Sequence, residues 1–120
     1  MARITILQNS RDGVYYAAGQ VIFEQGDVAK EMFVIQDGEV EILVDGEAVD
    51  VLDAGQAFGE MALVDRKPRS GTARARTDCR VVPVDERRFL FMVQETPNFA
   101  LQVMGLMADR LRKRNGRPET

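Results

Sequence analysis

The residues best suited to chemistry lie in one stretch, Phe58–Ala73, which reads FGEMALVDRKPRSGTA. Arg69 offers a planar fork of N–H donors that matches two oxygens of one phosphate group. Ser70 adds a hydroxyl donor beside it, and Gly59 lets a ligand approach the backbone closely. Residues 60–63 are good helix formers, so the free amides of their first turn would face an anion. Together these residue types predict a site for one small anion.

Glu60 does not fit a simple anion site, because its carboxylate would repel a phosphate. Its position makes sense if the carboxylate accepts hydrogen bonds from a sugar hydroxyl while Arg69 holds the phosphate. A ribose with a free 2′-OH and a 3′,5′-cyclic phosphate has this arrangement. The alternative is a short surface helix with a Glu60–Arg69 ion pair. Such a pair would contribute about 0–1 kcal/mol and would leave Gly59 and Ser70 without a role.

Residues 58–63 and 68–72 resemble the phosphate-binding cassette of the cyclic-nucleotide-binding domain family, whose halves read F-G-E-x-A-L and P-R-[AST]-A-[ST]. The step from Glu60 to Arg69 is also the family's. Upstream, the glycine-punctuated residues 17–42 resemble the family's opening strands. Both halves of the cassette, their spacing and the glycines agree, so the resemblance is specific.

The resemblance implies that the ligand is bound by Gly59, Glu60, Met61, Ala62, Arg69 and Ser70. Glu60 would bind the ribose 2′-OH, and Arg69 would pair with the cyclic phosphate. Ser70 and the amides near Met61 and Ala62 would complete the phosphate shell. One departure is Gly71, which stands where the family usually has alanine and which we expect to loosen the backbone behind the arginine.

Arg110 occupies the place at which related bacterial channel domains have an arginine that covers the base. Stacking of its guanidinium on a purine is physically reasonable. The alternative is a solvated residue near the end of a surface helix. The resemblance favours cAMP as the ligand and leaves cGMP open.

The function expected from the resemblance is that of a stand-alone regulatory module. It would bind a 3′,5′-cyclic nucleotide and signal by moving its last helix, through a protein partner or a homodimer. The alternative is a family member that no longer binds nucleotide and serves as a protein interaction module.

The composition limits the classes of protein that fit. The 120 residues favour a single domain over residues 1–120 with a core large enough to fold unaided. The absence of histidine removes Ser-His-Asp catalysis and imidazole metal sites, so we expect no enzyme, no metal and no cofactor. The net charge of -3 gives no reason to expect nucleic acid. The lone Cys79 is expected to be a small apolar residue on a strand. Without a signal peptide or a long apolar run, we expect no membrane and a cytoplasmic location.

The segment from about 14 to 84 must position these residues, and it reads as short strands separated by turns that contain glycine. The pattern predicts a mainly β fold with flanking helices, an antiparallel, jelly-roll-like β-roll. Asp37-Gly38 and Asp45-Gly46 each lie between apolar runs, which predicts two hairpins. The alternating residues expected to face the core are Val40, Ile42 and Val44.

Two C-terminal helices are expected after the roll, over about 85–95 and 97–114. Asp85 is a good N-cap for the first helix, and Pro97 suits the first turn of the second. The second helix has an apolar face wider than one core contact requires. It could pack permanently on the roll, or part of it could cover a ligand or meet a partner helix, and the sequence leaves these possibilities open. Gly105 in its middle predicts a close approach to the helix backbone.

Overall fold

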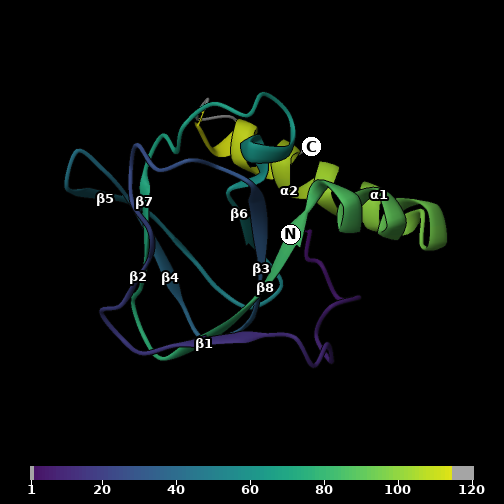
Figure 1. The fold of residues 1–120 in the computed structure, drawn as a ribbon, viewed down its shortest axis with the longest axis horizontal. Helices are drawn as coiled ribbons and strands as arrows, with labels where there is room; N and C mark the ends of the chain where they lie inside the picture. The colour runs from purple at the N-terminus through teal and green to yellow at the C-terminus, as the bar shows by residue number, and fades with distance from the viewer. Residues whose placement is uncertain (1, 115–120) are drawn as a thin grey trace.

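The computed structural model describes residues 2–114. Eight strands in these residues form two antiparallel sheets, with the strand orders β1–β8–β3–β6 and β2–β7–β4–β5. Figure 1 shows the two sheets on opposite sides of a roll, with both helices beside the sheet that contains β3 and β8. The strands are β1 Val14–Tyr16, β2 Val21–Phe23, β3 Glu31–Asp37, β4 Val40–Val44, β5 Glu47–Leu52, β6 Ala57–Phe58, β7 Thr72–Ala75 and β8 Cys79–Asp85. The predicted β-roll followed by two helices is confirmed.

Apolar side chains from both sheets fill the inside of the roll. The largest members of this core cluster are Phe33, Ile35, Val40, Leu52, Phe58 and Val81. Cys79 belongs to the same cluster and is 2% exposed, as expected for a small apolar residue on a strand. Burial raises the pKa of its thiol, so the cysteine stays protonated and unreactive at neutral pH.

One of the two predicted hairpins is present. The turn between β4 and β5 contains Asp45 and Gly46, whose φ angles of 52° and 83° fit a tight hairpin turn. The prediction for Asp37-Gly38 is wrong, because β3 and β4 belong to different sheets. Gly38 instead turns the corner between the sheets: its φ is 86°, and a Cβ there would lie 2.3 Å from the carbonyl oxygen of Asp78.

The predicted inward face of β4 is confirmed for two of its three residues. Val40 is buried in the core cluster and Ile42 packs against it, whereas Val44 is 37% exposed. Ile42 pairs with Asp50 of β5 and Leu43 pairs with Ala48, so the extra residue of this β-bulge is Val49 on β5, and β4 itself is regular. Val44 lines the same cavity as Ile42 but is not buried, so the prediction that it belongs to the core is wrong.

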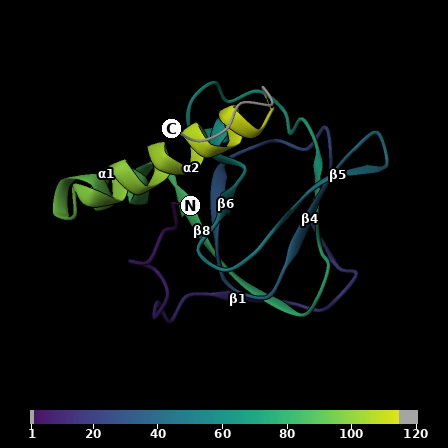
Figure 2. The same cartoon turned by 180° about the vertical axis from the view of Figure 1, so that it is seen from behind.

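The two helices are α1, Glu86–Glu95, and α2, Asn98–Arg114. The predicted cap of α1 is confirmed, because the Asp85 carboxylate accepts a hydrogen bond from the amide of Arg88 at 2.8 Å. Figure 2 shows α2 against the roll, while α1 projects away from it. The side chains that bury α2 in the core are Phe99, Val103 and Leu106. The first turns of α2 are therefore part of the core, and no residue from 107 to 114 is buried. Neither helix of residues 2–114 has the length and apolarity needed to cross a membrane.

The N-terminal segment packs against α2. Ile4 and Leu7 are buried in the same core cluster as the inner face of that helix. A Cβ on Gly105 would lie 2.7 Å from the Cβ of Ala2, so the predicted close approach to the helix backbone is confirmed. The amide of Ala2 donates to the Asp109 carboxylate at 2.9 Å. Gly105 therefore makes room for the start of the chain.

Candidate functional site

A cavity of about 520 Å³ lies between the 3₁₀ helix η1 (Glu60–Leu63), the strands β4 and β5, and the last turns of α2. Its wall brings together all the residues that the sequence predicts to bind a ligand: Gly59, Glu60, Met61, Ala62, Arg69, Ser70 and Arg110. Because Arg110 comes from the far end of the chain, the fold rather than proximity in sequence assembles this wall.

Arg69 is the buried charge of the cavity, at 8% exposed. Its Nη1 donates to the carbonyl oxygen of Gly59 at 3.1 Å, and its Nη2 donates to that of Glu31 at 2.7 Å. The guanidinium carbon lies 4.0 Å from the centre of the Phe23 ring, within range of a cation–π contact. Among the described residues nothing accepts from its Nε, although that atom is buried. Burial lowers the pKa of Arg69, as expected for a cation that has lost much of its hydration.

Gly59 is required at its position for two reasons. Its φ of 75° lies in the left-handed region, which favours glycine. A Cβ there would also lie 2.7 Å from Nη1 of Arg69. Any other residue would strain the turn and push the guanidinium out of its present place.

Glu60 pairs with a different arginine from the one considered in the sequence. Nη1 of Arg110 lies 2.8 Å from Oε1 of Glu60, and Arg110 also donates to the carbonyl oxygen of Ala57. The two side chains are 26% and 19% exposed, for Arg110 and Glu60 respectively. The alternative prediction of a surface ion pair between Glu60 and Arg69 is therefore wrong. The alternative description of Arg110 as a solvated residue is wrong as well. The ion pair joins the end of α2 directly to the cavity wall.

The polar groups of the remaining cassette residues differ in whether they are available to hydrogen-bond a ligand. The amide of Ala62 already donates to the carbonyl oxygen of Gly59 at 3.2 Å, so it is not an open donor. Ser70 is exposed at the cavity, and its hydroxyl is accessible to a ligand. Met61 is 54% exposed and offers the cavity an apolar side chain as well as its backbone.

Packing explains why position 71 holds a glycine, which could not be inferred from the sequence. A Cβ at this position would lie 2.9 Å from the backbone carbonyl oxygen of Leu43 on β4. The strand that follows Arg69 therefore approaches β4 too closely for the alanine usual in the family. The expected loosening behind the arginine is replaced by a tight backbone contact.

Several cavity residues were missed by the sequence analysis. Phe23, Asp50, Lys67 and Arg114 also lie on its wall, and none of them was expected from the sequence to have a role in binding. The charged side chains of the wall are the cations Lys67, Arg69, Arg110 and Arg114 and the anions Asp50, Glu60 and Asp65. Within the described residues the wall thus carries one net positive charge, which suits a ligand with a single negative charge. Among residues 2–114 no three His, Cys, Asp or Glu side chains are grouped as metal ligands would be.

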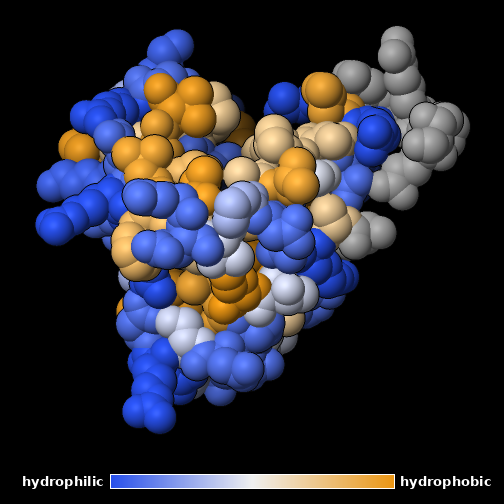
Figure 3. Space-filling view, turned by 90° about the vertical axis from the view of Figure 1, so that its right-hand side faces the viewer, coloured by the Kyte–Doolittle hydropathy of each residue, from blue (hydrophilic) through white to orange (hydrophobic). Residues whose placement is uncertain are grey.

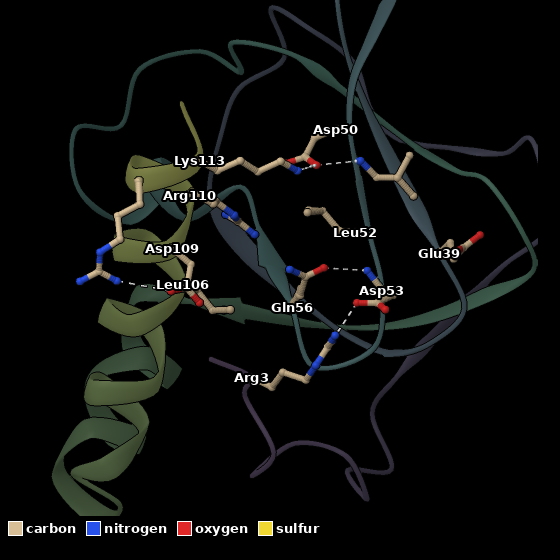
Figure 4. A pocket seen from close by; sticks show the side chains of 12 residues that line it. Arg3, Glu39, Asp50, Leu52, Asp53, Gln56, Leu106, Asp109, Arg110 and Lys113 are labelled. Carbon is tan, nitrogen blue, oxygen red and sulfur yellow. Dashed lines mark hydrogen bonds and ion pairs between the residues drawn. The ribbon is translucent and has the colours of Figure 1, made fainter. Parts of the chain in front are cut away.

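A second cavity of about 500 Å³ lies on the other side of the end of α2, and Figure 4 shows its residues. Asp50, Leu52 and Arg110 line both cavities. Lys113 of α2 and Asp50 of β5 point toward one another across this space, with their charged atoms 3.5 Å apart (Figure 4). The end of α2 therefore forms the partition between the two cavities.

Comparison with known proteins identifies the family. A family model described as the cyclic nucleotide-binding domain matches residues 13–96, well over half of the chain. The cAMP-dependent protein kinase regulatory subunit of Schizosaccharomyces pombe is 36% identical over 77 residues. That match covers 63% of this chain and 19% of the relative. The chain thus spans about a fifth of the length of the curated relatives that it matches.

Two solved structures are similar over most of the fold. The Thermus thermophilus catabolite activator protein is 29% identical with a TM-score of 0.75, and the similarity covers 86% of this chain and 51% of that one. The cAMP-bound form of the EAL enzyme Bd1971 is 34% identical with a TM-score of 0.60 over 86% of this chain and 29% of that one. On the family model, the fold and the cassette, this chain belongs to the cyclic-nucleotide-binding domain family.

Proposed function

We propose that this domain binds a 3′,5′-cyclic nucleotide, cAMP in preference to cGMP, in the cavity beneath η1. It would act as a regulatory module rather than as an enzyme. The proposal places the cyclic phosphate against Arg69 and Ser70 and the ribose against Glu60. The stand-alone status and the cytoplasmic location that the sequence predicts stay predictions.

The observation that carries the proposal is the state of Arg69. The guanidinium of Arg69 is buried, and among the described residues its Nε–H has no acceptor. This arrangement costs free energy, because the N–H has lost its hydrogen bond to water without gaining one to the protein. A turn of the side chain toward an anion in the cavity would supply the missing acceptor. A phosphate group has the geometry to take two of these donors at once.

The charges of the wall support a monoanion with a neutral hydroxyl. A 3′,5′-cyclic phosphate carries one negative charge, which the net positive charge of the cavity matches. Glu60 uses Oε1 for Arg110, and among the described residues nothing donates to its Oε2. That oxygen is therefore free to accept a hydrogen bond from the ribose 2′-OH.

The ion pair of Glu60 with Arg110 supports a route for the signal. A nucleotide that fixes Glu60 through its ribose also fixes the partner arginine, and with it the last turns of α2. Since Phe99, Val103 and Leu106 hold the first turns in the core, we propose that the movement is confined to the part of the helix after Leu106. The stacking of Arg110 on the base stays a prediction.

An apolar surface on the helices supports a protein partner, and of its residues Leu111 belongs to the part of α2 that would move. The exposed apolar side chains of α1 and α2 are Leu90, Phe91, Leu101, Met104 and Leu111. Figure 3 shows apolar side chains gathered on the side of the molecule on which α1 lies. A second copy of the chain or another protein would cover them. The same surface would serve the alternative function, an interaction module that binds no nucleotide.

The experiment that tests the site is calorimetric titration of an Arg69→Ala variant with cAMP. We expect binding to weaken by roughly 100- to 1000-fold, because the phosphate loses its paired charge. Glu60→Ala should weaken it less and should reduce discrimination against 2′-deoxy-cAMP. Arg76→Ala is the matched control, since Arg76 pairs with Glu39 outside the cavity and should leave affinity unchanged. Equal affinity of Arg69→Ala and the wild type would show that the phosphate lies elsewhere.

A further inference from the structure

Asp50 is an acidic residue on the inner face of the roll. It lies two residues before the buried Leu52 on β5, so both side chains point to the same side of the sheet. Its side chain is 28% exposed and lines the cavity beneath η1. A carboxylate on an inward-facing strand position requires an explanation, because neither the cassette nor the core uses it.

The described residues engage only one oxygen of Asp50. Oδ1 accepts a hydrogen bond from the amide of Val51 at 2.9 Å and lies 3.5 Å from Nζ of Lys113. Lys113 is 78% exposed, so this ion pair is weak. Among the described residues nothing donates to Oδ2. One acceptor oxygen is therefore free at the cavity.

The strand order places this oxygen at a distance from the phosphate end. Asp50 pairs with Ile42 of β4, which pairs with Ala73 of β7, the strand that follows Arg69. Asp50 is thus two strands away from the strand that follows the arginine, roughly 10 Å at the usual strand spacing. With the phosphate at Arg69 and the ribose at Glu60, the base is the part of a nucleotide left to reach this side. There it would meet the apolar Ile42, Val44, Val49 and Leu52, with Asp50 as the acidic group among them.

We propose that Asp50 determines which base is bound, by accepting a hydrogen bond from the 6-amino group of adenine. This rests on the proposed function. A 6-oxo purine would present a carbonyl oxygen at the same place, and two acceptors repel each other. Guanine could offer its N1–H and 2-amino donors to both oxygens of a carboxylate, but here Oδ1 would have to be shared with the amide of Val51, which weakens that pair. A single free acceptor fits the single amino group of adenine.

The decisive variant is Asp50→Asn, which keeps the shape of the side chain. The amide oxygen of asparagine would remain with the Val51 N–H, and its NH₂ group, a donor, would replace the free acceptor. The probes are cAMP and inosine 3′,5′-cyclic monophosphate (cIMP), which differ at position 6 of the base. The wild type should bind cAMP about 10- to 100-fold more tightly than cIMP. Asp50→Asn should bind cIMP as tightly as cAMP or more tightly.

Controls separate base reading from a structural role. Lys113→Met removes the partner of Asp50, and Glu47→Gln changes an exposed carboxylate on the same strand. Both should keep the wild-type preference for cAMP. A preference that survives in Asp50→Asn, or one that is lost equally in Lys113→Met, overturns the assignment, as does a wild type that binds cGMP more tightly than cAMP. If the wild type binds none of the three nucleotides, the proposed function itself has failed.

Discussion

Removal of the Arg110 side chain should uncouple α2 from the cavity. The Glu60–Arg110 pair is 19% and 26% exposed, between a surface pair worth about 0–1 kcal/mol and a buried pair whose loss costs about 3–5 kcal/mol. We therefore expect Arg110→Ala to weaken the docking of the helix end by about 1–2 kcal/mol. This corresponds to roughly a 5- to 30-fold rise in the undocked population. The core contacts of Phe99, Val103 and Leu106 should keep the rest of α2 in place.

Hydrogen exchange of the amides in residues 107–113 measures this population directly. In the wild type, saturating cAMP should slow exchange there, because a nucleotide that prefers the docked helix shifts the equilibrium toward it. In Arg110→Ala, exchange should be about 5- to 30-fold faster without nucleotide, and bound cAMP should add little protection. Arg112→Ala is the control, since within residues 2–114 Arg112 pairs only along the helix, with Asp109 at 3.6 Å. It should respond to cAMP as the wild type does.

Two results would refute this reasoning. Exchange in Arg110→Ala that equals the wild type, with and without cAMP, would show that the ion pair does not hold the helix end. A loss of the response in Arg112→Ala as large as that in Arg110→Ala would show a general effect of charge near the C-terminal turn. In either case the route from Glu60 to α2 would have to be abandoned.

The remaining predictions concern two glycines. Gly71→Ala should lower the free energy of unfolding by about 1–3 kcal/mol, because the new methyl group would meet the Leu43 carbonyl oxygen at 2.9 Å. Denaturant unfolding checks this, and an unchanged midpoint would contradict it. Gly105→Ala should gain less than the roughly 1 kcal/mol of an open helix site, because Ala2 must move from 2.7 Å and lose its bond to Asp109. A full gain in the same assay would show that the N-terminal contact contributes nothing.

Much of the fold could be predicted from residue types with strong local preferences. Asp45-Gly46 predicted a hairpin because both positions need positive φ, and Asp85 predicted a helix cap through its side-chain oxygen. Asp37-Gly38 carries the same dipeptide but joins two sheets, and this depends on the contact of Gly38 with β8. The bulge at Val49 of β5 likewise depends on pairing across the sheet. Local signals describe a turn but not the strands that it joins.

The residues of the candidate site also fall into two groups, those that a local motif identifies and those that only the fold brings to the cavity. Arg69 and Glu60 could be found because their motif is contiguous, and their chemistry follows from side-chain type. Their partners could not be found, because the Phe23 ring and Arg110 come from distant parts of the chain. Asp50 carries no motif at all, and only the strand order brings it to the cavity.

The central claim is tested most directly by calorimetric titration of the wild-type protein with cAMP and cGMP side by side. We predict a dissociation constant for cAMP in the micromolar range or tighter, about -8 kcal/mol or better in free energy. cGMP should bind more weakly if, as proposed, the free oxygen of Asp50 accepts from the 6-amino group of adenine. The absence of heat and of any thermal shift with both nucleotides at millimolar concentration would contradict the account and leave an interaction module.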